Sequence, residues 1–224
     1  MDLGVSPVVM GSFFFELISS SVAMQCLVVG VVALSTQAER IAALWQCLRG
    51  WYRNHKPSSM LDNLTKEMIF RDGKCKLRAK AAECRYLVPF CVYVANKVRH
   101  LSTHWMTVAS LFQRLYKLQM MVSGVAEWNA DEAGQLCRQF CSLLEALNRE
   151  ADGKNTWPIK PKLHLMQEPG LCIIHSPSSN IVETTSRASP GRPYSGPPIF
   201  SWESVMQSRN LCPLPYALFY VLFL

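Results

Sequence analysis

Residues 74–99 form the part of this chain that most constrains its fold. Small and apolar residues recur there at alternating steps of four and three, as they do along one stripe of a helix: Leu77, Ala81, Cys84, Val88, Cys91, Ala95 and Val98. From about Cys84 onward the opposite side is apolar too. A helix that is hydrophobic on both sides belongs at the centre of a globular fold or in lipid. The sequence therefore predicts a central helix, which Pro89 either kinks or splits into residues 75–88 and 89–100.

Three further segments between residues 36 and 152 have helical periodicity. Two of them open with a capping residue followed three positions later by Glu, at Thr36 and at Asn129. A short helix is expected around residues 64–70, stopped at the Asp-Gly pair that follows. These segments predict a mainly α fold, a bundle of four to six helices around the central one. Their apolar stripes are Ile41, Leu44, Trp45, Leu48, Trp51 and Tyr52; Trp105, Val108, Leu111, Phe112, Leu115, Leu118 and Val122; and Ala133, Leu136, Phe140, Leu143, Leu144 and Leu147.

Composition divides the chain into a hydrophobic N-terminal segment (residues 1–35), a helical domain (36–168) and a tail (169–224). Ten of the 13 prolines lie from Pro158 onward, and the tail is rich in Ser, so we expect it to be disordered up to a short hydrophobic end. Residues 17–34 carry no charge, and 18 residues reach the lower end of a membrane span. Serines dilute this run, so it is interpreted either as a buried strand followed by a helix or as a span.

No group of residues forms a self-sufficient catalytic motif. The nine cysteines include no CxxC pair and fall mostly on apolar helix faces, which favours buried thiols in a reducing compartment. His100 and His104 have a spacing that can chelate a metal, but solvated or capping histidines are favoured because no Glu lies between them. The same spacing of Cys137 and Cys141 is attributed to core packing. No metal site and no small-molecule ligand is therefore indicated.

The formal net charge of +7 is concentrated in one region. Residues 71–85 contain six Lys or Arg and two acidic residues. On the predicted helix these cations flank the apolar stripe and could hold a DNA or RNA backbone from two sides. The alternative is a solvated helix start whose lysines extend around a buried seam. The candidate nucleic-acid-binding residues are Lys74, Arg78 and Arg85 on one flank, Lys76 and Lys80 on the other, and Lys160 and Lys162 in a second basic spot.

Three groups of residues together resemble a known family. They are residues 2–5 (DLGV), residues 80–85 (KAAECR) with the Leu and Pro-Phe that follow, and residues 157–164 (WPIKPKLH). In this order and spacing they resemble the later part of CACTA-type and related transposase-like open reading frames, whose catalytic core is RNase H-like. The resemblance covers about residues 1–168, and it implies that the helical domain contains part of such a core.

The resemblance implies strand-transfer chemistry on DNA, in which carboxylates hold two divalent metal ions. Asp2 would match the acidic residue of the Asp-Leu-Gly-Val strand, and Glu168 would be the late carboxylate. Glu83 and Arg85 would form a structural ion pair. Upstream strands with an earlier Asp are absent from the chain, and no helix follows Glu168, so we expect a catalytically inactive fragment. Magnesium would be bound only by an intact parent core.

The expected function is therefore that of a mobile-element-derived helical fragment that binds nucleic acid weakly and without sequence preference. Such a protein would be intracellular, either nuclear or cytoplasmic. The alternative is a small membrane-associated helical protein anchored by residues 17–34. A helical interaction module without a ligand is the third interpretation.

Overall fold

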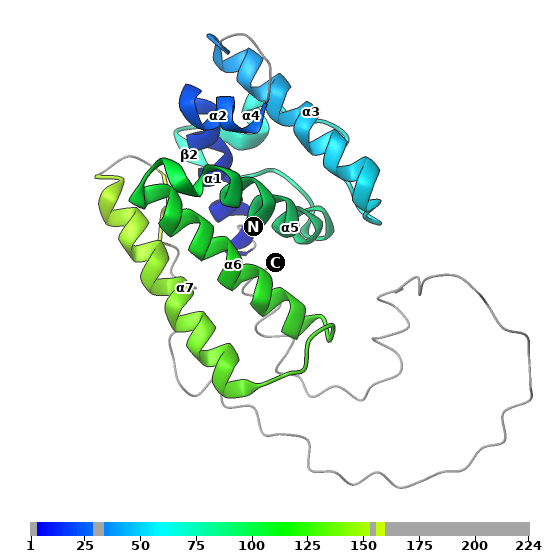
Figure 1. Ribbon diagram of the computed structural model, residues 1–224, viewed down its shortest axis with the longest axis vertical. Helices are drawn as coiled ribbons and strands as arrows, with labels where there is room; N and C mark the ends of the chain where they lie inside the picture. Colours follow the sequence, from blue (N-terminus) through cyan, green and yellow to red (C-terminus); the bar gives the residue numbers. More distant parts are fainter. Residues whose placement is uncertain (1–3, 29–33, 153–155, 160–224) are drawn as a thin grey trace, which may run out of the picture.

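The structure, a computed structural model, describes residues 4–28, 34–152 and 156–159. Within these ranges the chain forms helices, loops and one two-stranded antiparallel sheet, which confirms the predicted mainly α fold. The prediction for the tail, residues 169–224, lies outside the described residues. In chain order the elements are α1 (Ser6–Ser19), α2 (Ser21–Leu27), α3 (Gln37–His55), α4 (Lys66–Ile69), β1 (Phe70–Arg71), β2 (Lys74–Cys75), α5 (Ala81–Val98), the 3-10 helix η1 (Arg99–Leu101), α6 (Thr103–Val122) and α7 (Ala130–Glu150) (Figure 1).

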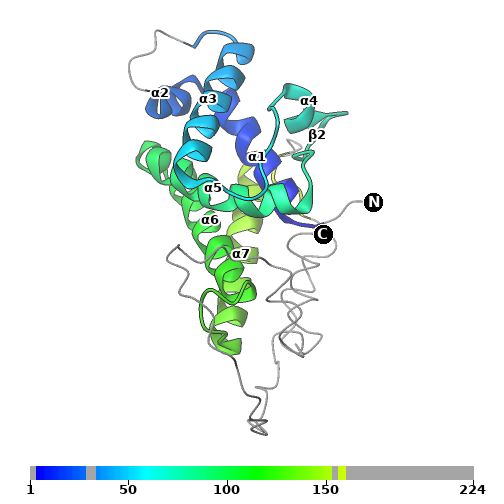
Figure 2. The ribbon, with the colours of Figure 1, turned by 90° about the vertical axis from the view of Figure 1, so that its right-hand side faces the viewer.

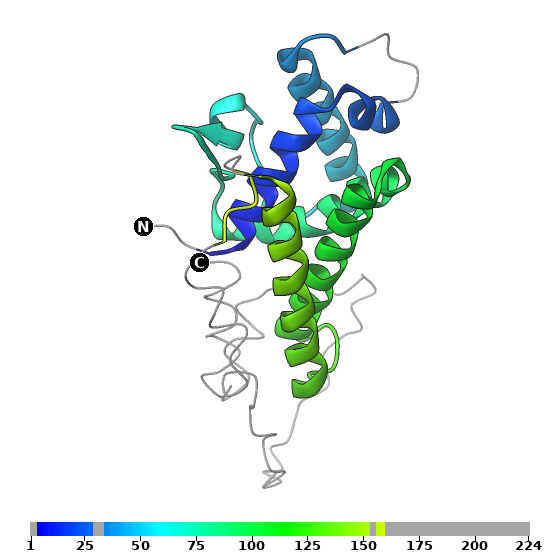
Figure 3. The same cartoon turned by 90° about the vertical axis from the view of Figure 1, so that its left-hand side faces the viewer.

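The helices pack around a single hydrophobic core. Helix α6 packs against both α5 and α7, and Figure 3 shows α6 and α7 side by side. Figure 2 shows α1 in the middle of the other half of the molecule, with α2 and α3 on one side of it and α4 with the hairpin on the other. Helix α1 therefore contacts α2, α3, α4, α5 and β2, and joins these elements to one another.

Helix α1 is a core element. Residues 6–14 are all buried, as expected for a helix that is apolar around most of its circumference. Phe13 packs against Phe112 of α6, with the ring centroids 4.7 Å apart. Phe14 meets Phe90 of α5 edge to face at 6.4 Å. The N-terminal segment thus supplies aromatic side chains to the centre of the core rather than forming a separate layer.

The conformation of residues 17–34 differs from the expected strand and helix, because their described part contains the end of α1 and the whole of α2 and no strand. Ser20 has an extended conformation that ends α1, and its hydroxyl caps α2 by accepting a hydrogen bond from the Ala23 N–H at 3.2 Å. Among the described residues, no single helix has the length and apolar character to cross a membrane. Helices α1 and α2, bent by 98° to one another, meet that criterion only as a pair.

The central helix begins later than predicted, at Ala81, and residues 74–80 are not helical. Asp72 (φ 54°) and Gly73 (φ 72°) are both in the left-handed region, as a type I′ hairpin turn requires. This turn pairs β1 with β2 as an antiparallel hairpin. The Asp-Gly pair therefore reverses the chain instead of ending a helix. The prediction that the basic residues flank a helical stripe is wrong for residues 74–80, which lie on and after β2.

Helix α5 continues through Pro89 without a break. Proline has no N–H to donate to the carbonyl of Arg85, four residues earlier. Gln119 of α6 supplies the missing donor, since its Nε2 lies 3.1 Å from that carbonyl oxygen. The Gln119 side chain is buried, so water does not compete for the bond. A side chain of the neighbouring helix thus replaces one backbone hydrogen bond, and α5 remains one helix where two were an equal expectation.

Trp157, the first residue of the WPIKPKLH motif, is fully buried. Its backbone N–H donates to the Ser12 hydroxyl at 3.0 Å, and its indole N–H donates to Glu16 at 2.7 Å. Its carbonyl accepts a hydrogen bond from Asn148 of α7 at 2.9 Å. The segment after α7 is therefore fastened to α1 by both polar contacts and packing.

The remaining helix predictions are confirmed. Thr36 forms a complete capping box, in which its hydroxyl accepts from the Glu39 N–H at 3.2 Å and Glu39 accepts from the Thr36 N–H at 2.9 Å. Asn129 caps α7 by accepting from the Glu132 N–H at 3.0 Å. The apolar stripes predicted for α3, α6 and α7 supply buried core residues. The cysteines of the described ranges form no disulfide.

We expect Gln119→Leu to destabilise the protein by about 1–3 kcal/mol, because it removes the Gln119 donor from the half-buried carbonyl of Arg85. In a Pro89→Ala background, residue 89 regains its N–H and satisfies that carbonyl, so the same substitution should cost clearly less. Urea unfolding of the two single variants and the double variant measures this difference.

Gln113→Leu is the matched control, since Gln113 of α6 donates to the Asn96 side chain at 3.1 Å and not to a backbone carbonyl. Its cost should be the same with Pro or Ala at position 89. Equal costs of Gln119→Leu in the two backgrounds would contradict the replacement of the backbone bond.

Candidate functional site

The basic residues that follow the hairpin turn share one face of residues 74–80. The odd-numbered Cys75 and Leu77 are buried. The even-numbered residues face outward, with Lys76 half-buried and the other three exposed. Side chains of an extended chain alternate between two faces, so successive even-numbered residues are about 6.6 Å apart along it. These four residues are named the basic row: Lys74, Lys76, Arg78 and Lys80.

The backbone of the basic row is fixed against α1 and α4. The Leu77 N–H donates to the carbonyl of Pro7 at 2.8 Å, and the Lys76 N–H donates to the carbonyl of Ile69 at 3.1 Å. Gly11 of α1 faces this segment, and a Cβ atom on it would lie 2.5 Å from both Leu77 N and Lys76 Cα. Only glycine permits this approach, because the atoms that a Cβ would meet belong to backbone. The row is therefore held on a rigid part of the core.

Two acidic side chains, Asp72 and Glu83, lie within ion-pair distance of cations in the basic row. Asp72 Oδ2 lies 3.4 Å from Arg71 Nε and 4.0 Å from Arg78 Nη2, and the three side chains are between 48 and 76 % exposed. Lys80 Nζ lies 4.0 Å from Glu83, whose carboxylate also accepts the Lys80 N–H at 2.7 Å at the start of α5. The Asp72–Arg78 pair is exposed on both sides, and such pairs contribute about 1 kcal/mol or less, whereas Glu83 in the pair with Lys80 is only 12 % exposed. Arg78 can therefore exchange Asp72 for an external anion, and the 86 % exposed Lys80 side chain can contact one as well.

The other predicted site residues are not part of the basic row. Arg85 lies on α5, where its Nε is buried and burial lowers the pKa of the guanidinium. Asp2, Glu168, Lys160 and Lys162 lie outside the described residues. Within the described ranges, no three His, Cys, Asp or Glu side chains are grouped so as to hold a metal ion.

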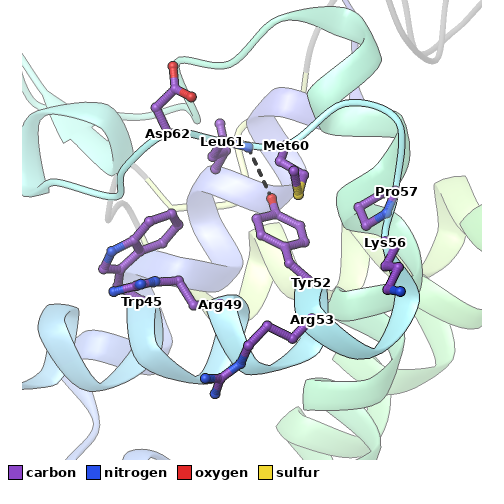
Figure 4. Close-up of a pocket in the computed structure, with 9 residues that line it drawn as sticks. All are labelled: Trp45, Arg49, Tyr52, Arg53, Lys56, Pro57, Met60, Leu61 and Asp62. Atoms are coloured by element: carbon purple, nitrogen blue, oxygen red, sulfur yellow. Dashed lines mark hydrogen bonds between the residues drawn. The ribbon is translucent and has the colours of Figure 1, made fainter.

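A second basic surface, which sequence reasoning missed, lines a groove of about 500 Å³ between α3 and the loop that follows it. Figure 4 shows Trp45 and Arg49 near one end of this groove, Lys56 at the other and Tyr52 between them. The loop residue Met60 contributes an exposed thioether, and the spacing of Arg49 and Arg53 places both on one side of α3. That spacing, next to two aromatic residues, is the sequence signal that could have indicated the groove.

Tyr52 fixes the inner wall of the groove. Its hydroxyl accepts a hydrogen bond from the Leu61 N–H at 3.2 Å, which ties the loop to α3 (Figure 4). Burial raises the pKa of Tyr52 to about 12, so the phenol remains neutral at physiological pH. The groove therefore combines a neutral aromatic wall with a cationic rim.

His104 forms a polar cluster with two carboxylates at the edge of the core. Its Nε2 lies 2.8 Å from Glu16 of α1, and its Nδ1 lies 2.8 Å from Glu150 of α7. Hydrogen bonding to Glu16, opposed by burial and assisted by Glu150, raises the pKa of His104 to about 9. The imidazole is therefore protonated at neutral pH and donates to both carboxylates. His100 is exposed on η1 and takes no part in this cluster.

The His104 cluster has the geometry of a structural link. Both ring nitrogens are engaged by carboxylates, and the second oxygen of Glu16 accepts the indole N–H of Trp157. A general base needs a nitrogen that can accept a proton from a substrate. An imidazolium whose two N–H groups both donate to carboxylates has no such nitrogen. The cluster joins α1, α6, α7 and the segment around Trp157.

No protein family, curated protein or solved structure matches this chain. The resemblance of residues 1–168 to transposase-like reading frames therefore stays a prediction, carried by its three sequence motifs. The function is inferred below from the chemistry of the described residues.

We expect Gly11→Ala to destabilise the protein by about 1–3 kcal/mol, because the added methyl group would meet the backbone at positions 76 and 77. Gly50→Ala in α3 is the control, since a Cβ there has only the end of the Arg53 side chain nearby, at 3.8 Å. It should stabilise the helix by up to about 1 kcal/mol. Urea unfolding measures both, and effects of the same sign would contradict the close approach of α1 to the basic row.

We expect the His104 cluster to make stability depend on pH. The pKa of His104 is higher in the folded protein (about 9) than its reference value of 6.5. Its contribution is therefore complete below pH 6.5 and is lost as the pH rises through 9. Up to about 3 kcal/mol of the unfolding free energy should disappear across this range. The difference in unfolding free energy between the native protein and His104→Gln, measured from pH 6 to 10, reports this loss.

His100→Gln is the matched control, because it removes an exposed imidazole four residues away. Its unfolding free energy should follow that of the native protein at every pH. A difference between native protein and His104→Gln that stays constant from pH 6 to 10 would refute the charged link.

Proposed function

We propose that this protein is a non-catalytic helical protein that binds the phosphate backbone of nucleic acids through the basic row. The observation that carries the proposal is the placement of Lys74, Lys76, Arg78 and Lys80 on one face of an extended segment. Cations at every second residue along one face of a segment suit a polymer of phosphates, since each can contact a different phosphate.

The composition of the segment supports the same function. Residues 71–80 contain five Lys or Arg against the single acid Asp72. The segment is anchored to α1 by backbone contacts, so little conformational freedom remains to be lost when an anion binds. The row does not lie on a helix that could enter the major groove of DNA and contact base edges. Contacts to phosphates alone favour binding without sequence preference.

Membrane association is the second candidate, as residues 17–34 led us to expect. An anionic lipid surface would also attract the basic row. The phosphate polymer is favoured because the apolar side chains of Leu17, Ile18, Ala23, Met24 and Leu27 are buried in the core, whereas Lys74, Arg78 and Lys80 are exposed. Catalysis is not part of the proposal, and a transposase ancestry is not needed for it.

We expect the triple variant Lys74→Gln/Arg78→Gln/Lys80→Gln to bind duplex DNA more weakly and with less salt dependence. Each phosphate contact contributes about 0.9 to the slope of log K against log salt, so the slope should fall by up to about 2.7. Fluorescence anisotropy of a labelled duplex between about 25 and about 200 mM salt measures it.

The control Arg99→Gln/Lys117→Gln/Arg138→Gln removes the same charge from exposed positions on η1, α6 and α7. Its slope should stay close to the native one. An equal fall in both variants would mean that net charge, and not the row, determines binding. If the native chain floats with anionic vesicles and binds no DNA at low salt, the membrane candidate replaces the proposed function.

A further inference from the structure

We infer that the groove between α3 and the loop after it is a nucleotide subsite, which takes one unpaired base with its phosphate from a single-stranded nucleic acid. The inference rests on the proposed function and adds a substrate class to it. The basic row alone would bind single and double strands through their phosphates. The groove would distinguish them, because only an unpaired base can leave a stack and enter it.

The aromatic wall of the groove is suited to a base. Trp45 is half-buried on α3 and lies along the groove, one helical turn from Arg49 (Figure 4). Base stacking on an aromatic side chain tolerates every base, since each has a π face. Met60 lines the groove and is 48 % exposed, and thioethers pack well against planar rings. A volume of about 500 Å³ is in the range of small-ligand sites.

The charges at the rim are suited to a phosphate. Arg49, Arg53 and Lys56 are exposed, and Asp62 is the only acidic residue that lines the groove. Neither arginine is held by an ion pair among the described residues, so both can turn toward a bound anion. An acidic peptide would satisfy the cations but not the aromatic wall, which is why a nucleotide is the occupant that the groove fits.

The groove and the basic row belong to consecutive parts of the chain. The loop that carries Lys56 and Met60 leads through Asp62 into α4 and then into the β1–β2 hairpin. The hydrogen bond between Tyr52 and Leu61 holds the start of this connection on α3. A strand bound to both surfaces would place phosphates along the row and one base in the groove.

The test compares a labelled oligothymidine with a duplex of equal length, both bound to the full chain. Trp45→Leu should weaken binding of the single strand by about tenfold, the lower part of the range for one stacked base. Trp45→Phe should retain most of the affinity because it keeps an aromatic face. Arg49→Gln/Arg53→Gln, which changes two exposed residues, should lower the single-strand salt slope by about 0.7 for each phosphate that the two arginines neutralise. Duplex affinity should change little in all three variants.

The outcomes separate the groove from the proposed function. If these variants leave single-strand binding unchanged while the triple variant of the basic row weakens it, the nucleotide subsite is refuted and the proposed function stands. If the native chain binds neither nucleic acid at low salt, both fail. If polyglutamate competes with oligothymidine as well as unlabelled oligothymidine does, at equal charge, the groove recognises charge alone and the subsite is refuted.

Discussion

The carboxylate of Glu16 is the contact on which the packing of the helical domain depends. One of its oxygens accepts from protonated His104 and the other from the indole of Trp157, 141 residues along the chain. A half-buried carboxylate is costly unless it is paired, and here two donors from different elements satisfy it. Because His104 also binds Glu150, a single polar cluster joins α1, α6 and α7. The cluster thereby fixes the position of α1 at the centre of the core.

Helix α1 connects this core to the surface that we propose to be functional. Its carbonyl at Pro7 and its glycine at Gly11 contact the backbone of residues 76 and 77. The same helix packs aromatic side chains against α5 and α6. A core element therefore supports the basic segment from one side, in addition to the hairpin pairing and the buried Cys75 and Leu77 side chains. This arrangement explains why a short segment after a two-residue turn can present its side chains in a fixed order.

Helices with local signals were predictable from the sequence, whereas contacts between distant residues were not. The capping box at Thr36 and the stripes of α6 and α7 depend on neighbours within one or two turns. The basic row was assigned to a helix because Leu77 happens to continue the stripe of α5, four residues before Ala81. The Asp72-Gly73 pair places the row in a hairpin, but such a pair is typical of both helix ends and hairpins. His104 and Trp157 gain their roles from partners 88 and 141 residues away, for which no local pattern exists.

The extended basic row is the central element of this account, and chemical footprinting of its lysines tests it most directly. The full chain is acetylated with and without a saturating DNA duplex at low salt, and the modified lysines are quantified by mass spectrometry. We expect Lys74 and Lys80 to lose most of their reactivity in the complex, because phosphates cover one face of residues 74–80. Lys117 of α6, which is exposed and remote in sequence, should react equally in both samples. Unchanged reactivity of Lys74 and Lys80 in a saturated complex would contradict the account.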